Sequence, residues 1–248
     1  MTDQWNDLRR HTRARIGLGR KGNGLPTRRQ LEFVAAHAVA RDAVHAPLEV
    51  APLVERLRAM GCGEPMVVHS AATDRDTYLR RPDLGRIPEP GTMLPHIGSD
   101  IGIALCDGLS STAIAEHGPG LATVIAGALR GLTIAPPVVA TQARVALGDH
   151  IGEQLGVTTM LVLIGERPGL SVADSVGIYL THHPRPGRSD AERNCVSNIH
   201  PPDGMTYDHA ARVVAALVDG ARRLEASGVG LKDTSRDPAL TDAERPAL

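Results

Sequence analysis

The stretch TTMLVLIGE, residues 158–166, decides the fold that the sequence predicts. Its centre, MLVLI, is continuously apolar, which suits a strand covered by helices on both faces. Three more short β-rich runs are EPMVVHS (64–70), DIGIALCDG (100–108) and LTIAPPVVA (132–140). Helical patterns lie between and after these runs, at 111–131, 148–156 and 206–228, the last with Gly228 as its expected cap. Strands that alternate with helices at this spacing predict an α/β fold built on a parallel, doubly wound sheet.

Ahead of the first strand, the sequence predicts an arm at 1–26 and two helices, at 26–45 and 47–61. On the first helix, five apolar residues fall on one helical face: Leu31, Val34, Ala35, Ala38 and Val39. We therefore expect an N-terminal arm and helical portion at 1–62, an α/β domain at 63–232 and a disordered tail at 233–248. The charged, proline-rich segment 73–96 is either a functional loop or a flexible insertion.

Composition excludes several function classes. The formal net charge of −1 gives no general attraction to nucleic acid or an acidic membrane, and 2% aromatic residues argue against stacking platforms for bases. The longest apolar runs are strand-sized, and no apolar run follows the basic residues of the N-terminus, so neither a membrane span nor a secretory signal is expected. Three widely spaced cysteines form no disulfide framework, which fits a reducing cytoplasm.

A metal site is not expected either. The three cysteines have no zinc spacing, and the eleven histidines are scattered. The only close pair, His182 and His183, is adjacent, so in an extended chain the two rings point to opposite faces.

Four segments at predicted strand ends are candidates for chemistry: CDGLSS (106–111), QARVALGDHIGE (142–153), IGERPGL (164–170) and ERNCVSNIH (192–200). In the first, Asp107 ends a strand and Ser110 or Ser111 can cap the next helix, whose N–H groups could accept an anion; a plain N-cap is the alternative. In the second, Asp149 is placed as a helix cap near a backbone that could cradle a polar ligand edge.

The third and fourth segments carry a carboxylate and a thiol. Glu166, with Arg167 beside it, either fixes a loop as an ion pair or accepts hydrogen bonds from a ligand. Cys195 and His200 invite a nucleophile–base interpretation, but they lie five residues apart and lack a third partner, so we favour a structural thiol.

Taken together, the segments resemble the small subunit of ethanolamine ammonia-lyase. The strongest matches are RVALGDHIGEQLG, VLIGERPGLSVADSVGIYLT and RNCVSNIHPPDG, and SAATDRDTYLRRPDLGR and DGLSSTAIAEH precede them in order. The resemblance runs over most of residues 13–232.

This resemblance implies a Rossmann-like domain at 63–232 that binds base-on adenosylcobalamin, with contacts at Val145, Glu166 and Cys195. The family converts ethanolamine to acetaldehyde and ammonia. The resemblance also implies a hetero-oligomer with a large TIM-barrel subunit that holds the substrate, so no catalytic residue is expected in this chain. The expected compartment is the cytoplasm, with enclosure in a bacterial microcompartment as a second option.

Two details bear on that resemblance. The first motif reads QARVALGD, with alanine where the family more usually has glycine before the arginine. The DxHxxG pattern of proteins that replace the cofactor's own base with histidine is absent, which agrees with a base-on cofactor. Two alternatives from other classes remain: a stand-alone Rossmann-like nucleotide-binding enzyme, for which no phosphate-binding glycine loop is present, and a purely structural subunit.

Overall fold

A computed structural model describes residues 4–235 of the chain. Its helices are α1 (Gln4–Arg9), α2 (Thr27–His45), α3 (Val50–Arg58), α4 (Arg75–Arg80), α5 (Ser111–Ala128), α6 (Leu147–Leu155) and α7 (Tyr207–Leu224). Its strands are β1 (Met66–His69), β2 (Ile101–Cys106), β3 (Val138–Thr141), β4 (Thr159–Gly165), β5 (Val176–His182) and β6 (Asn194–Ile199). The tail predicted at 233–248 lies outside the described residues from 236 onward, and the domain boundary at 62/63 stays a prediction.

The six strands form one mixed sheet in the order β1-β3-β2-β4-β5-β6. Neighbours among the first four strands in this order are parallel, whereas β5 is antiparallel to both β4 and β6. The α/β class is confirmed, but the sheet predicted as mostly parallel is mixed, because β5 is antiparallel to both of its neighbours. The Rossmann-like, doubly wound arrangement stays a prediction. The connection 166–175 between β4 and β5 contains no helix, and without a long crossover the chain can only return antiparallel.

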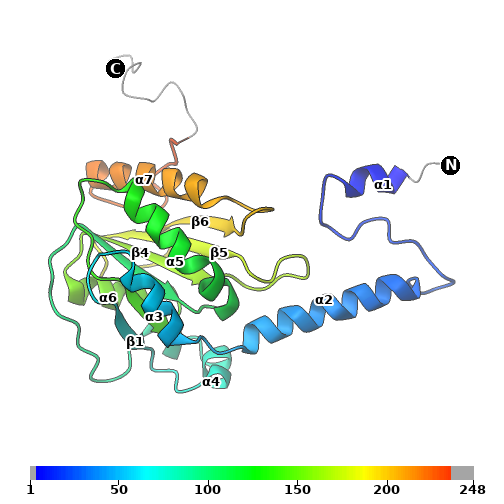
Figure 1. Ribbon diagram of the computed structural model, residues 1–248, viewed down its shortest axis with the longest axis horizontal. Coiled ribbons are helices and arrows are strands. Elements are labelled where there is room, and N and C mark those ends of the chain that lie inside the picture. Colours follow the sequence, from blue (N-terminus) through cyan, green and yellow to red (C-terminus); the bar gives the residue numbers. More distant parts are fainter. Residues whose placement is uncertain (1–3, 236–248) are drawn as a thin grey trace, which may run out of the picture.

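Helices cover both faces of the sheet (Figure 1). α5 and α7 pack together on one face, where their apolar side chains meet those of β2, β4 and β5. α6 lies on the opposite face and packs against β4 through Leu147, Ile151 and Leu155. α3 also belongs to this body, because Leu53 and Leu57 are buried in the same cluster as α5 and α7.

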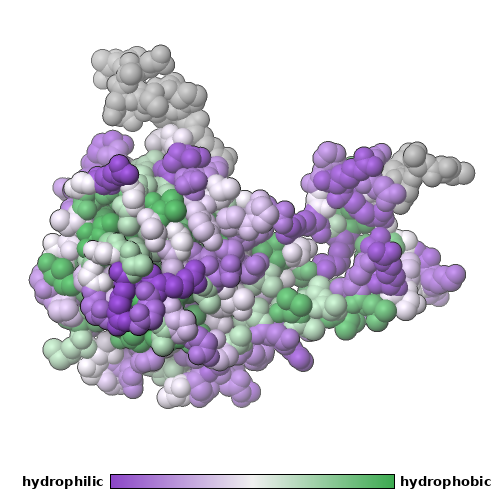
Figure 2. All heavy atoms as spheres, viewed as in Figure 1, coloured by the Kyte–Doolittle hydropathy of each residue, from purple (hydrophilic) through white to green (hydrophobic). Residues whose placement is uncertain are grey.

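Helix α2 runs away from the body toward α1 (Figure 1). The predicted helix is confirmed, but its apolar face is not covered within the described chain: Leu31 is 64% exposed and Val39 58%. Phe33, on another side of the helix, is 40% exposed, and Ala43 alone in α2 is buried. Figure 2 shows hydrophobic residues, coloured green, gathered along this helix.

Helix ends follow the sequence in part. Ser110 caps α5 as predicted, because its hydroxyl accepts a hydrogen bond from the N–H of Ala113 at 3.2 Å. The expected cap at Gly228 is wrong, since α7 ends at Leu224 and Glu225 takes the left-handed conformation (φ 51°). A left-handed residue turns the chain out of the helix wherever it occurs, and here glutamate supplies it.

Candidate functional site

A cleft of about 530 Å³ lies at the carboxyl ends of β2, β3 and β4. The chain leaves β2 through α5 on one face of the sheet and leaves the neighbouring β3 through α6 on the other. Where adjacent strands send their connections to opposite faces, a crevice opens outside the strand ends, and α/β proteins bind ligands there. The topology therefore places this cleft where a ligand site is expected.

Two glycines form the floor of the cleft. The carbonyl of Gly165 accepts a hydrogen bond from the N–H of Leu109 at 2.9 Å, so the turn after β2 lies directly against the end of β4. A Cβ atom on Gly108 would meet the Gly165 carbonyl at 2.2 Å, and one on Gly165 would meet the Ser110 carbonyl at 2.0 Å. Only glycine permits this approach, and the resulting floor presents backbone rather than side chains.

The turn after β3 carries Val145 into the cleft. Asp107, buried at the end of β2, accepts hydrogen bonds from the backbone N–H groups of Gln142 and Ala143, each at 2.8 Å. Gln142 has a φ of 52°, a conformation that costs free energy in a residue with a Cβ and must be held by its surroundings. Asp107 therefore positions the turn, whereas the sequence indicated only that this residue ends a strand.

Arg75 completes this arrangement. Its guanidinium lies 3.2 Å from the Asp107 carboxylate and also donates to the carbonyl of Val44 in α2 at 2.7 Å. Burial raises the pKa of Asp107, and the N–H of Ala143 and the charge of Arg75 oppose that rise. The contacts connect the end of α2 to the turn that carries Val145.

Tyr78 forms one wall of the cleft between two guanidinium groups. Arg75 and Arg144 lie over its ring at 4.7 and 4.3 Å from the centroid, in cation–π geometry. The phenol is fully buried, which raises its pKa, and it donates to the carbonyl of Ala143 at 3.1 Å. The sequence left two alternatives for the segment 73–96, a functional loop or a flexible insertion. In the structure this segment supplies helix α4 and a wall of the cleft.

Glu166 lies at the rim, directly after β4. Its backbone N–H donates to the carbonyl of Ser175 at 2.9 Å, and one carboxylate oxygen accepts the backbone N–H of Asn198 at 3.2 Å. A Cβ on Gly177 would lie 3.0 Å from the other carboxylate oxygen, so Gly177 leaves room for it over β5. Glu166 does not pair with its neighbour Arg167, which rules out the ion-pair alternative within the described residues.

Cys195 lies near the amino end of β6 rather than at the carboxyl end of a strand. It is the second residue of β6 and pairs with Tyr179 of β5, a residue that lines the cleft. Burial raises the pKa of Tyr179 to about 12. Val145 and Glu166 therefore share one cleft. Cys195 does not line it: Cys195 neighbours the cleft residue Tyr179 across the strands, and it lines a second pocket with Val196 and Met205.

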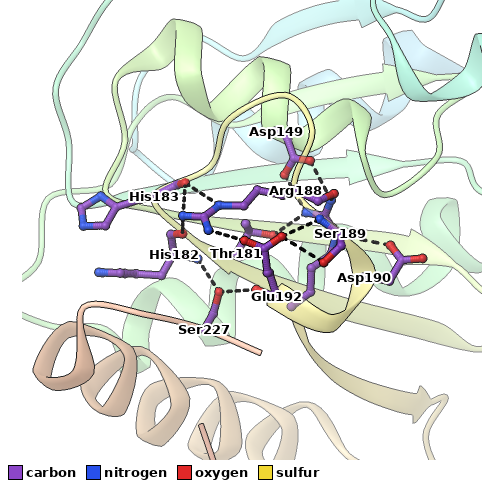
Figure 3. A network of polar contacts seen from close by, with 10 residues as sticks. Asp149, Thr181, His182, His183, Arg188, Ser189, Asp190, Glu192 and Ser227 are labelled. Atoms are coloured by element: carbon purple, nitrogen blue, oxygen red, sulfur yellow. Dashed lines mark hydrogen bonds and ion pairs between the residues drawn. The ribbon is translucent and has the colours of Figure 1, made fainter. Parts of the chain in front are cut away.

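Asp149 is not the cap of α6, contrary to the sequence-based expectation. Ala146 occupies the cap position, and the carboxylate of Asp149 points to Arg193, which precedes β6. Figure 3 shows the network around this pair, in which Arg188 and Glu192 hold the connection between β5 and β6. The network fixes the start of β6 and so the position of Cys195.

Three residues of the site escaped the sequence analysis: Tyr78, Arg144 and Tyr179. A usable signal existed for the tyrosines, since the chain has only three and two of them line the cleft. Arg144 carried no such signal, because arginine supplies nearly all of the positive charge of this chain.

Within residues 4–235, no group of three His, Cys, Asp or Glu side chains could hold a metal ion. The rings of His182 and His183 do not point to opposite faces as predicted, since their centroids are 4.3 Å apart. His183 has a φ of 48°, which ends the extended conformation on which that expectation depended. In the same part of the chain, no helix is long and apolar enough to cross a membrane.

Comparison with known proteins gives a consistent result. Residues 2–232 match the model of the family described as ethanolamine ammonia-lyase light chain (EutC). A protein of Rhodococcus erythropolis named ethanolamine ammonia-lyase small subunit is 58% identical over 243 residues, covering 98% of this chain and 95% of that protein. A protein of the same name from Ralstonia nicotianae is 47% identical, covering 98% and 93%. The match extends over nearly the whole of each chain, so this chain belongs to the family of ethanolamine ammonia-lyase small subunits.

Proposed function

We propose that this chain is the cofactor-binding subunit of an adenosylcobalamin-dependent ethanolamine ammonia-lyase. When bound, base-on adenosylcobalamin supplies the radical by homolysis of its cobalt–carbon bond. The observation that carries the proposal is that Val145 and Glu166, two residues to which the family resemblance assigns cobalamin contacts, line one cleft, while Cys195 pairs with the cleft residue Tyr179.

The residues present fit such a group. The backbone floor at Gly108 and Gly165 admits a flat ligand edge, and the free side of the Glu166 carboxylate can accept N–H bonds from the amides on the corrin rim. Val145 and Leu109 supply apolar contact. A cleft of about 530 Å³ suits a drug-sized ligand, whereas a cobalamin is larger, so the cofactor would be shared with a second protein surface.

This chain would bind and orient the cofactor, and no step of the substrate reaction is assigned to its residues. Asp107 holds the backbone turn that presents Val145, and the Asp149–Arg193 pair holds the strand that presents Cys195. Positioning of this kind is what a protein contributes when a cofactor carries the chemistry. The substrate-binding groups would belong to the large subunit.

Glu166→Ala tests the proposal in the enzyme assembled with its large subunit. Loss of a charged hydrogen-bond acceptor is expected to weaken cyanocobalamin binding about tenfold or more, while subunit association persists. Glu153→Ala, which removes an exposed carboxylate from α6, is the matched control. An unchanged dissociation constant for Glu166→Ala would argue for a purely structural subunit, and ammonia release by the chain alone would refute the subunit assignment.

The larger partner, for which we propose a TIM barrel, would cover α2 and the arginine-rich arm. A helix that carries apolar residues on several sides is normally buried, yet α2 exposes Leu31, Phe33 and Val34. The family name, small subunit, supports a larger subunit as the protein that covers them. The assembled enzyme would then act in the cytoplasm, free or enclosed in a bacterial microcompartment.

Substitution of two exposed residues tests this docking surface. Leu31→Gln with Val34→Gln is expected to abolish co-purification with the large subunit and to leave the helical circular dichroism of the chain unchanged. Leu224→Gln, at an α7 position that is 58% exposed, is the control for a general loss of surface hydrophobicity. Normal co-purification of the double variant would exclude α2 as the contact.

A further inference from the structure

We propose that Arg144 is the anion receptor of the cleft and binds the phosphodiester of the cobalamin nucleotide tail. The inference rests on the proposed function and adds the ligand group that this part of the cleft recognises. Neither the family match nor the named relatives assign a role to Arg144.

The guanidinium of Arg144 is held in place but has no counter-charge. It lies over the buried ring of Tyr78 at 4.3 Å, and one terminal nitrogen donates to the Tyr78 carbonyl at 3.5 Å. Its Nε atom is buried without a hydrogen-bond partner, and no carboxylate of the described residues pairs with it. A charge that is partly removed from water is costly unless a partner compensates it, so the partner is expected to come with the ligand.

The charges around Arg144 leave the cleft positive. Arg75, on the other side of Tyr78, is neutralised by Asp107 at 3.2 Å. Glu166 already accepts the N–H of Asn198, and the exposed Arg167 forms no ion pair with any described carboxylate. The cleft therefore holds two unpaired guanidiniums and one carboxylate, a balance that favours a ligand with an anionic group.

A phosphodiester fits this receptor better than the other groups of the cofactor. The side chains on the corrin rim are neutral amides, and the phosphodiester of the nucleotide tail is the anionic group that the cofactor offers. A planar guanidinium can bind two phosphate oxygens at once, and stacking on Tyr78 fixes the plane of that fork before the ligand arrives. Glu166 would then bind the amide edge while Arg144 binds the tail.

The test measures the binding of two ligands by visible spectroscopy in the assembled enzyme. Cyanocobalamin carries the phosphodiester, and cobinamide lacks the nucleotide tail. Arg144→Gln is expected to weaken the binding of cyanocobalamin about 10–100-fold and the binding of cobinamide less than about twofold. Arg144→Lys keeps the charge but lacks the planar guanidinium, so its affinity for cyanocobalamin should lie between those of the wild type and Arg144→Gln. Arg130→Gln, at an exposed arginine after α5, is the control and leaves both affinities unchanged.

Salt gives a second measurement that does not depend on cobinamide. Affinity of the wild type for cyanocobalamin should fall as sodium chloride is raised from about 0.05 to 0.5 M, and Arg144→Gln should remove most of that dependence. The unliganded variant should keep the thermal midpoint of the wild type, which separates loss of a ligand contact from loss of structure.

Each contrary outcome has a distinct meaning. If Arg144→Gln weakens the binding of cyanocobalamin and of cobinamide equally, the inference is overturned in favour of a structural role for Arg144. Unchanged cyanocobalamin affinity in Arg144→Gln, with Glu166→Ala still weakened, would overturn the inference and leave the proposed function standing. If inorganic phosphate binds to Arg144 in the apoenzyme without competing with cyanocobalamin, the receptor serves a free anion and the inference is again overturned. Unchanged affinity in both variants would refute the proposed function itself.

Discussion

The carboxylate of Asp149 and the guanidinium of Arg193 form a doubly hydrogen-bonded ion pair, with N–O distances of 2.6 and 2.7 Å (Figure 3). Each side chain is 2% exposed. The pair joins the first turn of α6 to the residue before β6, and its two members lie 44 positions apart in the sequence. It therefore fixes β6, the edge strand of the sheet, to the helix that follows the Val145 turn.

Removal of one member of this pair should destabilise the fold strongly. Arg193→Met leaves a buried carboxylate without a counter-charge, which typically costs about 3–5 kcal/mol. Urea unfolding of the purified chain measures the loss. The double variant Asp149→Leu with Arg193→Met removes both charges and should recover much of it. A double variant as unstable as the single one would mean that the pair acts through packing rather than charge.

Asp107→Asn should loosen the turn that carries Val145. An asparagine side chain offers one oxygen to the two backbone N–H groups of Gln142 and Ala143, and its NH₂ group would face one of these N–H donors. We therefore expect the free energy of unfolding to fall by about 1–3 kcal/mol. The result should be a lower free energy of unfolding together with weaker cyanocobalamin binding. Asp76→Asn, at an exposed carboxylate of α4, is the control. Full cofactor affinity in Asp107→Asn would show that the turn keeps its shape without the carboxylate.

Cys195 should react slowly with iodoacetamide at pH 7 although it lies at the surface. Burial raises the pKa of its thiol, the hydroxyl of Tyr179 opposes that rise, and the charge of Glu166 adds to it. Because the thiolate is the reactive form, the rate should rise as the pH is taken above the ordinary thiol range. Mass spectrometry of the alkylated peptides measures this rate, with half-buried Cys62 as the internal reference. Bound cyanocobalamin should protect Cys195 and not Cys62, and equal protection of both would contradict the proposed contact.

Asp100 should contribute to stability in a defined pH range. The backbone N–H of Thr133 and then the guanidinium of Arg222 lower the pKa of Asp100 to about 2. Since this lies below the unfolded value of about 3.9, the stabilisation is complete above that value and is lost as the pH falls toward 2. Asp100→Asn should therefore show a smaller decrease in unfolding free energy than wild type between about pH 4 and 2. Asp42→Asn, at an exposed position on α2, should keep the wild-type pH profile.

Local patterns predicted most elements of the parallel half of the sheet. The apolar run at 158–166 became β4, and the helical pattern at 148–156 became α6 within one residue at each end. The strand pattern is reliable because a strand that is buried on both faces requires a continuous run of apolar residues. β5 was missed because its apolar residues follow the loop signals of ERPGLSVAD, and nothing local says that the chain returns antiparallel there.

The candidate site was predictable only where one residue carried an unusual feature. Glu166 stood out as a carboxylate at the end of an apolar strand. Arg144 did not stand out, because its missing counter-charge is a property of the fold. The same holds for Tyr179, whose role comes from cross-strand pairing with Cys195.

The sequence by itself determined the α/β class, most of the helices and strands and the family, since these depend on local apolar periodicity and on ordered motifs. Only the tertiary structure decided that β5 reverses the sheet, that Asp149 pairs with Arg193, and that Tyr78 and Arg144 meet Val145 in one cleft. The physical reason is that charge compensation and hydrogen bonding act through space. A buried donor takes whichever acceptor the fold brings within 3 Å, however far away it lies in the chain.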